Sequence, residues 1–188
     1  MWEPYLGTSF KDRRLLLLGE SCYSWIDKAG ERCHPQQDHP HLTVGWAIKD
    51  IPRTDHPLCQ MMTRGLCGKY APSLEARRAA WASVAFTNYI PVTVGDNPRV
   101  RPKKAHWDQA ANEWRDLLAT VKPRNIVVIG KQLWDRLPHS DDEVADIAKV
   151  AVYRLTDNSP VTCRWMYHSA AGGSWRTLMA TIQALETA

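Results

Sequence analysis

Four consecutive leucines, Leu15 to Leu18, constrain the fold of this chain more than any other feature. The run is too short to cross a membrane, and because no polar residue interrupts it, we expect both of its faces to be buried. Strands that are buried on both faces belong to parallel sheets covered by helices. The run ends at Gly19, and in an open α/β sheet the ligand binds beyond the carboxyl ends of the strands. We therefore expect functional residues directly after Leu18.

Other apolar segments alternate with helical patterns along the 188 residues. Apolar residues recur at three- and four-residue steps between Ala105 and Val121, which predicts an amphipathic helix. The alternation predicts a three-layer α/β/α sandwich with a mostly parallel central sheet, in a single domain over residues 1–188. Strands are expected at about 14–18, 83–91, 125–130, 151–155 and 161–167, and helices at about 74–81, 105–121, 131–137, 141–149 and 175–185.

Residues 25–70 show no persistent helical or strand period and are rich in His, Pro and Cys. Only residues 42–51 have a weak strand or short-helix character. A long irregular stretch inside a compact domain is usually functional, so we expect an irregular lid or insertion here. Zinc held by Cys33, His34, His39 or His41 is one interpretation. We favour solvent-exposed loop histidines instead, and we expect no metal and no cofactor.

Cysteine usage and charge indicate the compartment and the class of partner. The five cysteines form no Cys-x-x-Cys pair, and the chain has neither a secretory signal nor a long apolar run. These features predict reduced thiols in a cytoplasmic protein that does not enter a membrane.

The formal net charge of +4 is compatible with a polyanionic partner. A basic cluster, which is either a solvated face or a phosphate-binding surface, comprises Arg99, Arg101, Lys103 and Lys104.

Polar side chains stand at the ends of three separate apolar strands: Gly19-Glu20-Ser21, Asn88 and His168. A lone histidine is more often structural than catalytic, and an isolated asparagine more often caps a turn. The joint placement of all three is more specific. It predicts a site where the carboxyl ends of the parallel strands meet.

In their order and spacing these motifs resemble those of the uracil-DNA glycosylase superfamily, over about residues 15–185 apart from 25–70. Residues 19–23, Gly-Glu-Ser-Cys-Tyr, are similar to the first motif of that family, Gly-Gln-Asp-Pro-Tyr or Gly-Glu-Ala-Pro-Gly. Asn88 is placed like the asparagine that reads the flipped base. His168-Ser169-Ala170 resembles the second catalytic motif, His-Pro-Ser. Residues 97–102 resemble the basic, proline-bearing segment, and residues 125–137 resemble the strand-Gly-helix unit before the last motif.

The resemblance implies a DNA glycosylase, which flips a base out of DNA and hydrolyses its N-glycosidic bond. A neutral His168 would donate a hydrogen bond to the base oxygen where negative charge develops, and Asn88 would read the edge of the base. The resemblance also implies DNA as the partner, and we expect a monomer. The expected site comprises Glu20, Ser21, Asn88 and His168 for catalysis, Gly19, Tyr23 and Ser169 for the substrate, and the basic cluster with the Gly172, Gly173 and Ser174 backbone for phosphates.

The departures from the family pattern bear on the substrate. Ser21 stands where the best-known branch has an aspartate that orients water, so Glu20 is the nearest carboxylate. Tyr23 matches a tyrosine that bars substituents on the pyrimidine 5-carbon, but Cys22 replaces a proline beside it, and Ser169 replaces another. The paired cysteine spacing of the iron–sulfur branches is missing. We favour a modified pyrimidine, such as the hypermodified cytosine that bacterial relatives excise from phage DNA, over uracil in base-excision repair.

Two further interpretations stay open. Gly19-Glu20-Ser21 is also typical of a serine esterase that would use Ser21 and His168. However, one esterase class has Asp three residues before the His, where this chain has Trp165, and the α/β-hydrolase elbow has Gly where this chain has Tyr23. The second interpretation is a catalytically inactive nucleic-acid-binding module, which the serine at position 21 supports.

Overall fold

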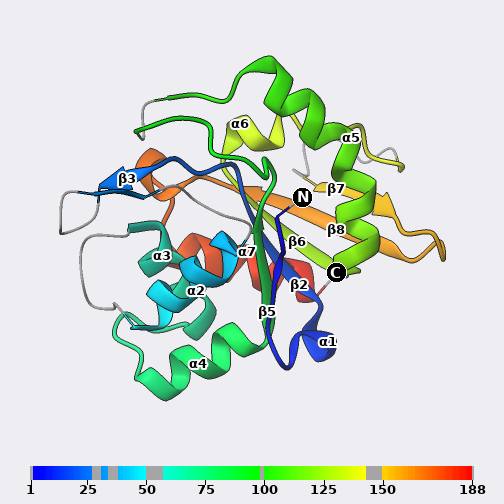
Figure 1. The fold of residues 1–188 in the computed structure, drawn as a ribbon. Coiled ribbons are helices and arrows are strands. Elements are labelled where there is room, and N and C mark those ends of the chain that lie inside the picture. Colours follow the sequence, from blue (N-terminus) through cyan, green and yellow to red (C-terminus); the bar gives the residue numbers. More distant parts are fainter. Residues whose placement is uncertain are drawn as a thin grey trace.

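The computed structural model describes residues 2–26, 31–33, 38–49, 57–97, 100–142 and 150–187. It is an α/β protein whose six-stranded, mostly parallel sheet is flanked by helices (Figure 1). The sheet order is β1-β5-β2-β6-β8-β7. Its strands are β1 (Tyr5–Leu6), β2 (Leu15–Gly19), β5 (Val84–Asn88), β6 (Asn125–Ile129), β7 (Val150–Arg154) and β8 (Pro160–Met166).

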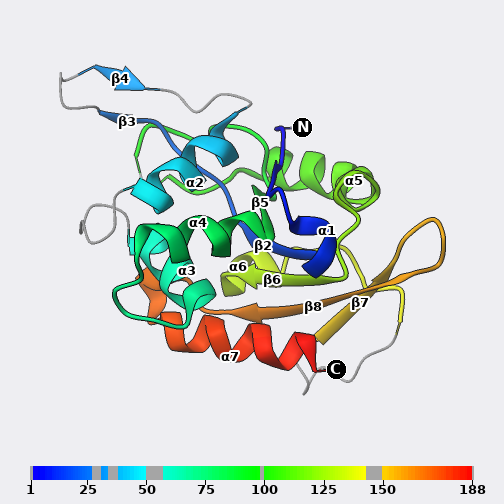
Figure 2. The same cartoon turned by 90° about the horizontal axis from the view of Figure 1, so that it is seen from below.

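The helices lie on both faces of this sheet (Figure 2). Within the described ranges, none has the length and the apolar character that crossing a membrane requires. A small second sheet pairs β3 (Trp25–Ile26) with β4 (Arg32–Cys33). The helices are α1 (Phe10–Arg13), α2 (His39–Lys49), α3 (Pro57–Cys67), α4 (Leu74–Ala82), α5 (Lys104–Val121), α6 (Lys131–Trp134) and α7 (Trp175–Glu186), with a 3-10 turn η2 (Ser169–Ala171).

The leucine run forms β2 and lies at the centre of the sheet. It pairs in parallel with β5 on one side and with β6 on the other, and β6 pairs in parallel with β8. Leu15 to Leu18 are fully buried, which confirms the prediction of a strand covered on both faces. The two edge strands, β1 and β7, run antiparallel to their neighbours, so the sheet is mixed rather than wholly parallel.

Alternation along β2 divides the interior into two cores. Leu16 and Leu18 face α5 and α6, whereas Leu15 and Leu17 face α2, α3, α4 and α7. Burying each leucine side chain contributes about 2 kcal/mol to stability. Because both cores rest on this one strand, its register fixes the positions of the residues that follow it.

Residues 39–49 and 57–67 form α2 and α3. The expectation of irregular structure is wrong for α3 and for the start of α2, whereas a short helix was one of the two forms expected at 42–51. Both helices contribute apolar residues, such as Val44 and Met62, to the core that Leu15 and Leu17 face. Pro57 is the first residue of α3, where the missing N–H costs nothing because that group has no partner inside the helix. Residues 27–30, 34–37 and 50–56 lie outside the described residues.

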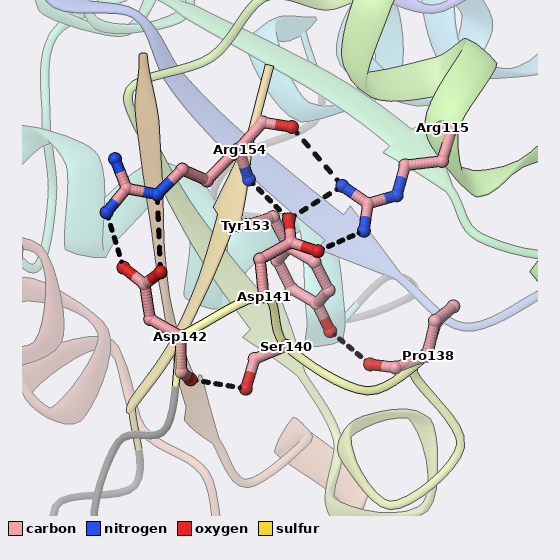
Figure 3. Close-up of polar contacts among 7 residues, drawn as sticks. All are labelled: Arg115, Pro138, Ser140, Asp141, Asp142, Tyr153 and Arg154. Carbon is pink, nitrogen blue, oxygen red and sulfur yellow. Dashed lines mark hydrogen bonds and ion pairs between the residues drawn. The ribbon is translucent and has the colours of Figure 1, made fainter. Parts of the chain in front are cut away.

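Ion pairs hold β7 against the segment that precedes it and against α5 (Figure 3). The guanidinium of Arg115 in α5 donates to Asp141 Oδ2 at 2.7 Å, and Arg154 in β7 donates to Asp142 Oδ2 at 2.8 Å. Asp142 also forms an antiparallel bridge with Val152. The acidic pair therefore does not begin the helix expected at 141–149, and residues 143–149 lie outside the described residues.

Candidate functional site

Gly19, Asn88 and His168 all lie at one edge of the sheet, where β2, β5 and β8 end. Gly19 and Asn88 are paired as the last residues of β2 and β5, and His168 follows β8 by two residues. In the sheet order, β5 and β8 are separated by β2 and β6, which puts their ends about 14 Å apart, or three inter-strand spacings. The carboxyl edge thus gathers the three strand-end positions that the sequence singles out.

Asn88 is buried beside Gly19. Only 7% of Asn88 is exposed, and a Cβ on Gly19 would collide with its Oδ1 atom. Among the described residues, no side chain or backbone group forms a hydrogen bond with the Asn88 amide. The Asn88 amide is not among the polar atoms that lack both solvent contact and a partner, so it can form hydrogen bonds with a ligand. Gly19 therefore creates the space that this amide occupies.

Backbone pairing continues past the ends of β2 and β5 and holds the loop that carries Glu20 to Tyr23. The N–H groups of residues 89, 90 and 94 donate to the carbonyls of residues 19, 20 and 22 at 2.8–3.0 Å. Beyond them, the Ser24 N–H donates to Gly95 O at 2.9 Å. These bonds give residues 19–24 a fixed path along residues 88–95.

Glu20 and Ser21 interact directly. The Ser21 side chain lowers the pKa of the neighbouring Glu20 carboxyl. Burial raises the pKa of Glu20 above its ordinary value, while the charge of Arg101 and the Ser21 side chain oppose that rise. Ser21 and Arg101 thus both favour the ionised form of Glu20.

Tyr23 is half-buried, and its ring packs against the core on the α5 side of the sheet. Burial raises the pKa of its hydroxyl, the positive charge of Arg101 lowers it, and Cys22 and Glu20 raise it further. The phenol is therefore neutral at physiological pH. Its ring lies on the opposite side of the sheet from the Asn88 side chain, because Asn88 continues the β5 face that contains Phe86.

His168 caps η2 with its ring. The Nδ1 atom accepts a hydrogen bond from the Ala170 N–H at 3.1 Å. Burial lowers the pKa of this imidazole, and the charge of Arg101 lowers it further. A neutral ring whose Nδ1 atom accepts a bond carries its proton on Nε2. His168 is thus a neutral donor, and Ser169, the first residue of η2, is half-buried beside it.

A tight glycine turn fixes the His168 backbone. Gly172 has a φ of 88°, and no Cβ would fit on Gly173 because the Tyr167 carbonyl lies against it. The Gly173 N–H donates to the His168 carbonyl at 3.0 Å, so it is not free for a phosphate as the sequence analysis expects. Ser174 is the N-cap of α7, and its Oγ accepts from the Thr177 N–H at 3.1 Å.

The structure divides the basic cluster. Arg99 lies outside the described residues. Arg101 is exposed, yet its charge acts on Glu20, Tyr23 and His168. Lys103 and Lys104 are exposed at the start of α5, where Lys104 Nζ forms an ion pair with Asp108 Oδ2 at 2.6 Å. Sequence reasoning assigns Arg101 to phosphates alone and does not predict that its charge lowers the pKa of Glu20 and His168.

The histidine-rich segment also departs from expectation. His39 is buried, with its ring centroid 5.4 Å from that of Trp2 and 6.1 Å from that of Trp46. Burial lowers its pKa to about 4. The expectation of a solvent-exposed loop histidine is therefore wrong for His39, whereas His41 is exposed and His34 lies outside the described residues. Over the ranges that the structure describes, no three His, Cys, Asp or Glu side chains gather as metal ligands would.

A cleft of about 660 Å³ opens at the opposite edge of the sheet. Its lining includes Arg13, Arg14, Arg124, Asn125 and Glu186, which lie near the amino ends of β2 and β6 and the end of α7. Arg13 forms an ion pair with Glu186 at 2.6 Å across this cleft. The cleft is therefore separate from the carboxyl-edge site.

Comparison of the sequence with protein-family models gives no match, and comparison with curated proteins gives none either. The arrangement of side chains at the carboxyl edge is therefore the basis on which a function can be assigned.

Proposed function

We propose that this protein is a DNA N-glycosylase with the three-layer α/β/α fold of the uracil-DNA glycosylase superfamily. It would flip a modified or damaged base out of DNA and hydrolyse its N-glycosidic bond, leaving an abasic site. The observation that carries the proposal is the buried Asn88 amide, which has no hydrogen-bond partner among the described residues and lies on the same edge as the neutral His168 donor. Both groups suit the polar edge of a nucleobase.

The two side chains would act from opposite ends of the site. The Asn88 amide offers one donor and one acceptor group, which can pair with the hydrogen-bonding edge of a pyrimidine. The His168 Nε2–H can donate to the base oxygen on which negative charge develops as the glycosidic bond breaks. The spacing of about 14 Å between the strand ends is wide enough for a planar base to lie between the two residues.

Glu20 would act on the sugar side of the reaction. Its carboxylate can stabilise the positive charge that develops on the sugar and can accept a proton from the attacking water. A pKa raised by burial makes it a better proton acceptor than an ordinary carboxylate, provided that it stays ionised. The Ser21 side chain supports the ionised form, because it lowers this pKa.

A modified pyrimidine, such as the hypermodified cytosine of phage DNA, is the substrate that we favour, with uracil as the second choice. The Tyr23 ring rests on the core and is directed away from the sheet face of Asn88, which supports a pocket open to substituents on the pyrimidine 5-carbon. Phage defence would follow from the first substrate and base-excision repair from the second. We propose that the protein acts as a monomer on DNA.

The test is a panel of duplexes that contain uracil, hypoxanthine, mismatched thymine, or hydroxymethylated or glucosylated cytosine. Alkali-labile strand breaks identify the base that is released. His168→Ala and Asn88→Ala should each lower the single-turnover rate by about 10²–10⁴-fold while DNA binding remains measurable. Full activity in both variants would overturn the proposal. Binding without strand breaks in any duplex would favour the inactive module, and phosphonate-sensitive hydrolysis of a fluorogenic ester would favour the esterase.

A further inference from the structure

The cleft at the amino edge of the sheet is built by the segments that lead into three paired parallel strands. Arg14 and Arg124 directly precede β2 and β6, and Thr162 lies near the start of β8. The Arg14 carbonyl accepts the N–H groups of Arg124 and Asn125 at 2.8 and 3.2 Å. The Arg124 carbonyl in turn accepts the Thr162 N–H at 2.9 Å. The sheet therefore fixes the positions of these lining residues.

Asn125 contributes a buried amide to the lining. Only 5% of the residue is exposed, and no group in the described part of the chain forms a hydrogen bond with its side chain. Neither amide atom is among those that lack both a partner and contact with solvent. The donor and the acceptor of Asn125 are therefore open to a ligand in the cleft.

Thr162 stands beside Asn125 on the same face of the sheet. The two residues are register partners in β6 and β8. Side chains alternate along a strand, and Val127 and Met166, each an even number of residues further on, belong to the core that α7 covers. The amide of Asn125 and the hydroxyl of Thr162 thus lie next to each other near the end of α7, where Leu185 adds an apolar wall.

Two arginines of the lining have guanidinium N–H groups available. Arg14 Nε donates to Lys122 O at 2.7 Å, which holds the side chain at a fixed point, and no described residue accepts from its two terminal nitrogens. Arg124 is exposed and forms neither an ion pair nor a side-chain hydrogen bond with any residue of the described ranges. Arg13, by contrast, is paired with Glu186. The cleft thus holds two cations that can bind an anion.

The carboxylates around the cleft do not cancel this charge. Glu186 is neutralised by Arg13 at 2.6 Å. Asp157, outside the lining, accepts the Ser159 N–H at 2.9 Å, and Asp12, the other carboxylate of the lining, is exposed. The lining therefore carries three arginines against two carboxylates, and its volume of about 660 Å³ lies in the range of small-molecule sites.

We propose that this cleft binds a small phosphate ester, whose phosphate contacts Arg14 and Arg124 and whose remaining polar groups reach Asn125. A phosphate monoester presents three acceptor oxygens, and a guanidinium binds phosphate through two parallel N–H···O bonds. Two arginines on neighbouring segments can share these oxygens, whereas a carboxylate would be saturated by one guanidinium. The inference does not rest on the proposed glycosylase, because the cleft and the carboxyl-edge site lie at opposite edges of the sheet.

The experiment is nitrogen-edited two-dimensional NMR of the full chain, which follows the Asn125 side-chain amide and the Arg14 Nε–H. The probes are inorganic phosphate, adenosine monophosphate and adenosine, at constant ionic strength. The monophosphate should shift both signals saturably and bind more tightly than inorganic phosphate, because only the ester can also reach Asn125. Adenosine should shift neither signal.

Three results would overturn the inference. The first is the absence of a saturable shift with either phosphate probe, and the second is binding of adenosine as tightly as of the monophosphate. The third is a DNA duplex that shifts the same signals and displaces the monophosphate, which would assign the cleft to the DNA backbone.

Variants test whether the named residues form the site. Arg124→Gln removes an exposed guanidinium, so it opens no cavity, and it should weaken binding of the monophosphate by about ten- to a hundredfold. Asn125→Asp keeps the side-chain shape but adds a carboxylate, and it should weaken binding similarly. Arg78→Gln, which removes an exposed arginine of α4 outside the lining, is the matched control and should leave the affinity unchanged. Circular dichroism checks folding, and equal affinities of the Arg124 and Arg78 variants would refute the site.

Discussion

The Asn88 side-chain oxygen occupies the space beside Gly19 that a Cβ atom would fill. The contact follows from strand register, because Gly19 and Asn88 are paired as the last residues of β2 and β5. The contact links Gly19, at the end of β2, to Asn88, at the end of β5, through packing alone. The identity of residue 19 therefore determines where the amide of residue 88 can lie.

Replacing Gly19 by alanine should displace the Asn88 amide and lower base release by about a hundredfold. The same change should destabilise the fold by about 1–3 kcal/mol through overpacking. Single-turnover kinetics and urea unfolding measure the two effects. Gly45→Ala is the matched control: apart from its chain neighbours and the backbone of its own helix, no atom lies within 4 Å of its added Cβ, and a helical alanine should stabilise α2 by about 0.5–1 kcal/mol. Equal activity of the two variants would separate Asn88 from catalysis.

Ser21→Ala should change the pH dependence of the reaction more than its rate at neutral pH. Removing the hydroxyl removes an interaction that lowers the pKa of Glu20, so this pKa should rise further. Activity that requires the Glu20 carboxylate is present above its pKa and is lost as pH falls through it, so the acid limb should move to higher pH. The pKa of His168 is lowered from its ordinary value of 6.5, so protonation of His168 affects the rate only below that pH. An acid limb that does not move would show that Ser21 does not act on Glu20.

Asp141→Asn should destabilise the protein by about 1 kcal/mol at pH 7, a value near the upper limit for partly exposed ion pairs. The hydrogen bond from Arg115 holds the pKa of Asp141 at about 2, below its ordinary value of 3.8. A carboxylate with a lowered pKa contributes stability above pH 3.8 and loses it as pH falls through about 2. Urea unfolding of both proteins should therefore converge near pH 2.

The control for Asp141 is Asp135→Asn, which breaks an exposed pair with Lys131 one helical turn away in α6. Such a pair contributes about 0.2–0.5 kcal/mol. An Asp141 variant no less stable than the Asp135 variant would show that the contacts in Figure 3 do not hold β7 in place.

Lys103 and Lys104 should differ in their effects on DNA binding although they are neighbours. If Lys103 contacts a phosphate, Lys103→Gln should reduce the slope of log K against log salt by about 1. Lys104→Gln should reduce it less, because Lys104 is already paired with Asp108. Lys11→Gln, in α1 at the other edge of the sheet, controls for net charge. Identical slopes for all three variants would remove the start of α5 from the DNA-binding surface.

The central strands and α5 were predictable because their patterns are long and uninterrupted. The apolar runs of β2 and β6 require burial on both faces, and α5 repeats its apolar positions over five turns of helix. The antiparallel edges were not predictable: β1 has two residues, and β7 has one fully buried residue. The local sequence therefore predicted the positions of the central strands well, but it did not predict that the two edge strands run antiparallel to their neighbours.

The errors have identifiable physical causes. The prolines and histidines of residues 39–67 look like breakers of regular structure, but Pro57 begins a helix, where proline is tolerated. Asp141 and Asp142 resemble the acidic first turn of a helix, but two arginines distant in sequence bind them instead. In each case a tertiary contact overrides a local preference.

The candidate site was predictable as far as strand ends determine it. The carboxyl ends of parallel strands meet at one edge, which brings Gly19, Asn88 and the end of β8 together. The effects of Arg101 and Ser21 on the pKa of Glu20 depend on the path of loops, which carry no periodicity. Two backbone anchors, Gly95 on Val100 and the start of α5, determine that path.

The backbone bond from Ala170 to His168 has a consequence for evolution and for engineering. The proton position on the ring is selected by a peptide group, which every amino acid except proline supplies, so substitutions along η2 can be neutral. The vulnerable position is instead Gly173, whose missing side chain lets the chain turn beneath Tyr167. A side chain there would displace the Tyr167 carbonyl and the His168 backbone without changing any polar side chain, and a mutational screen limited to polar residues would overlook it.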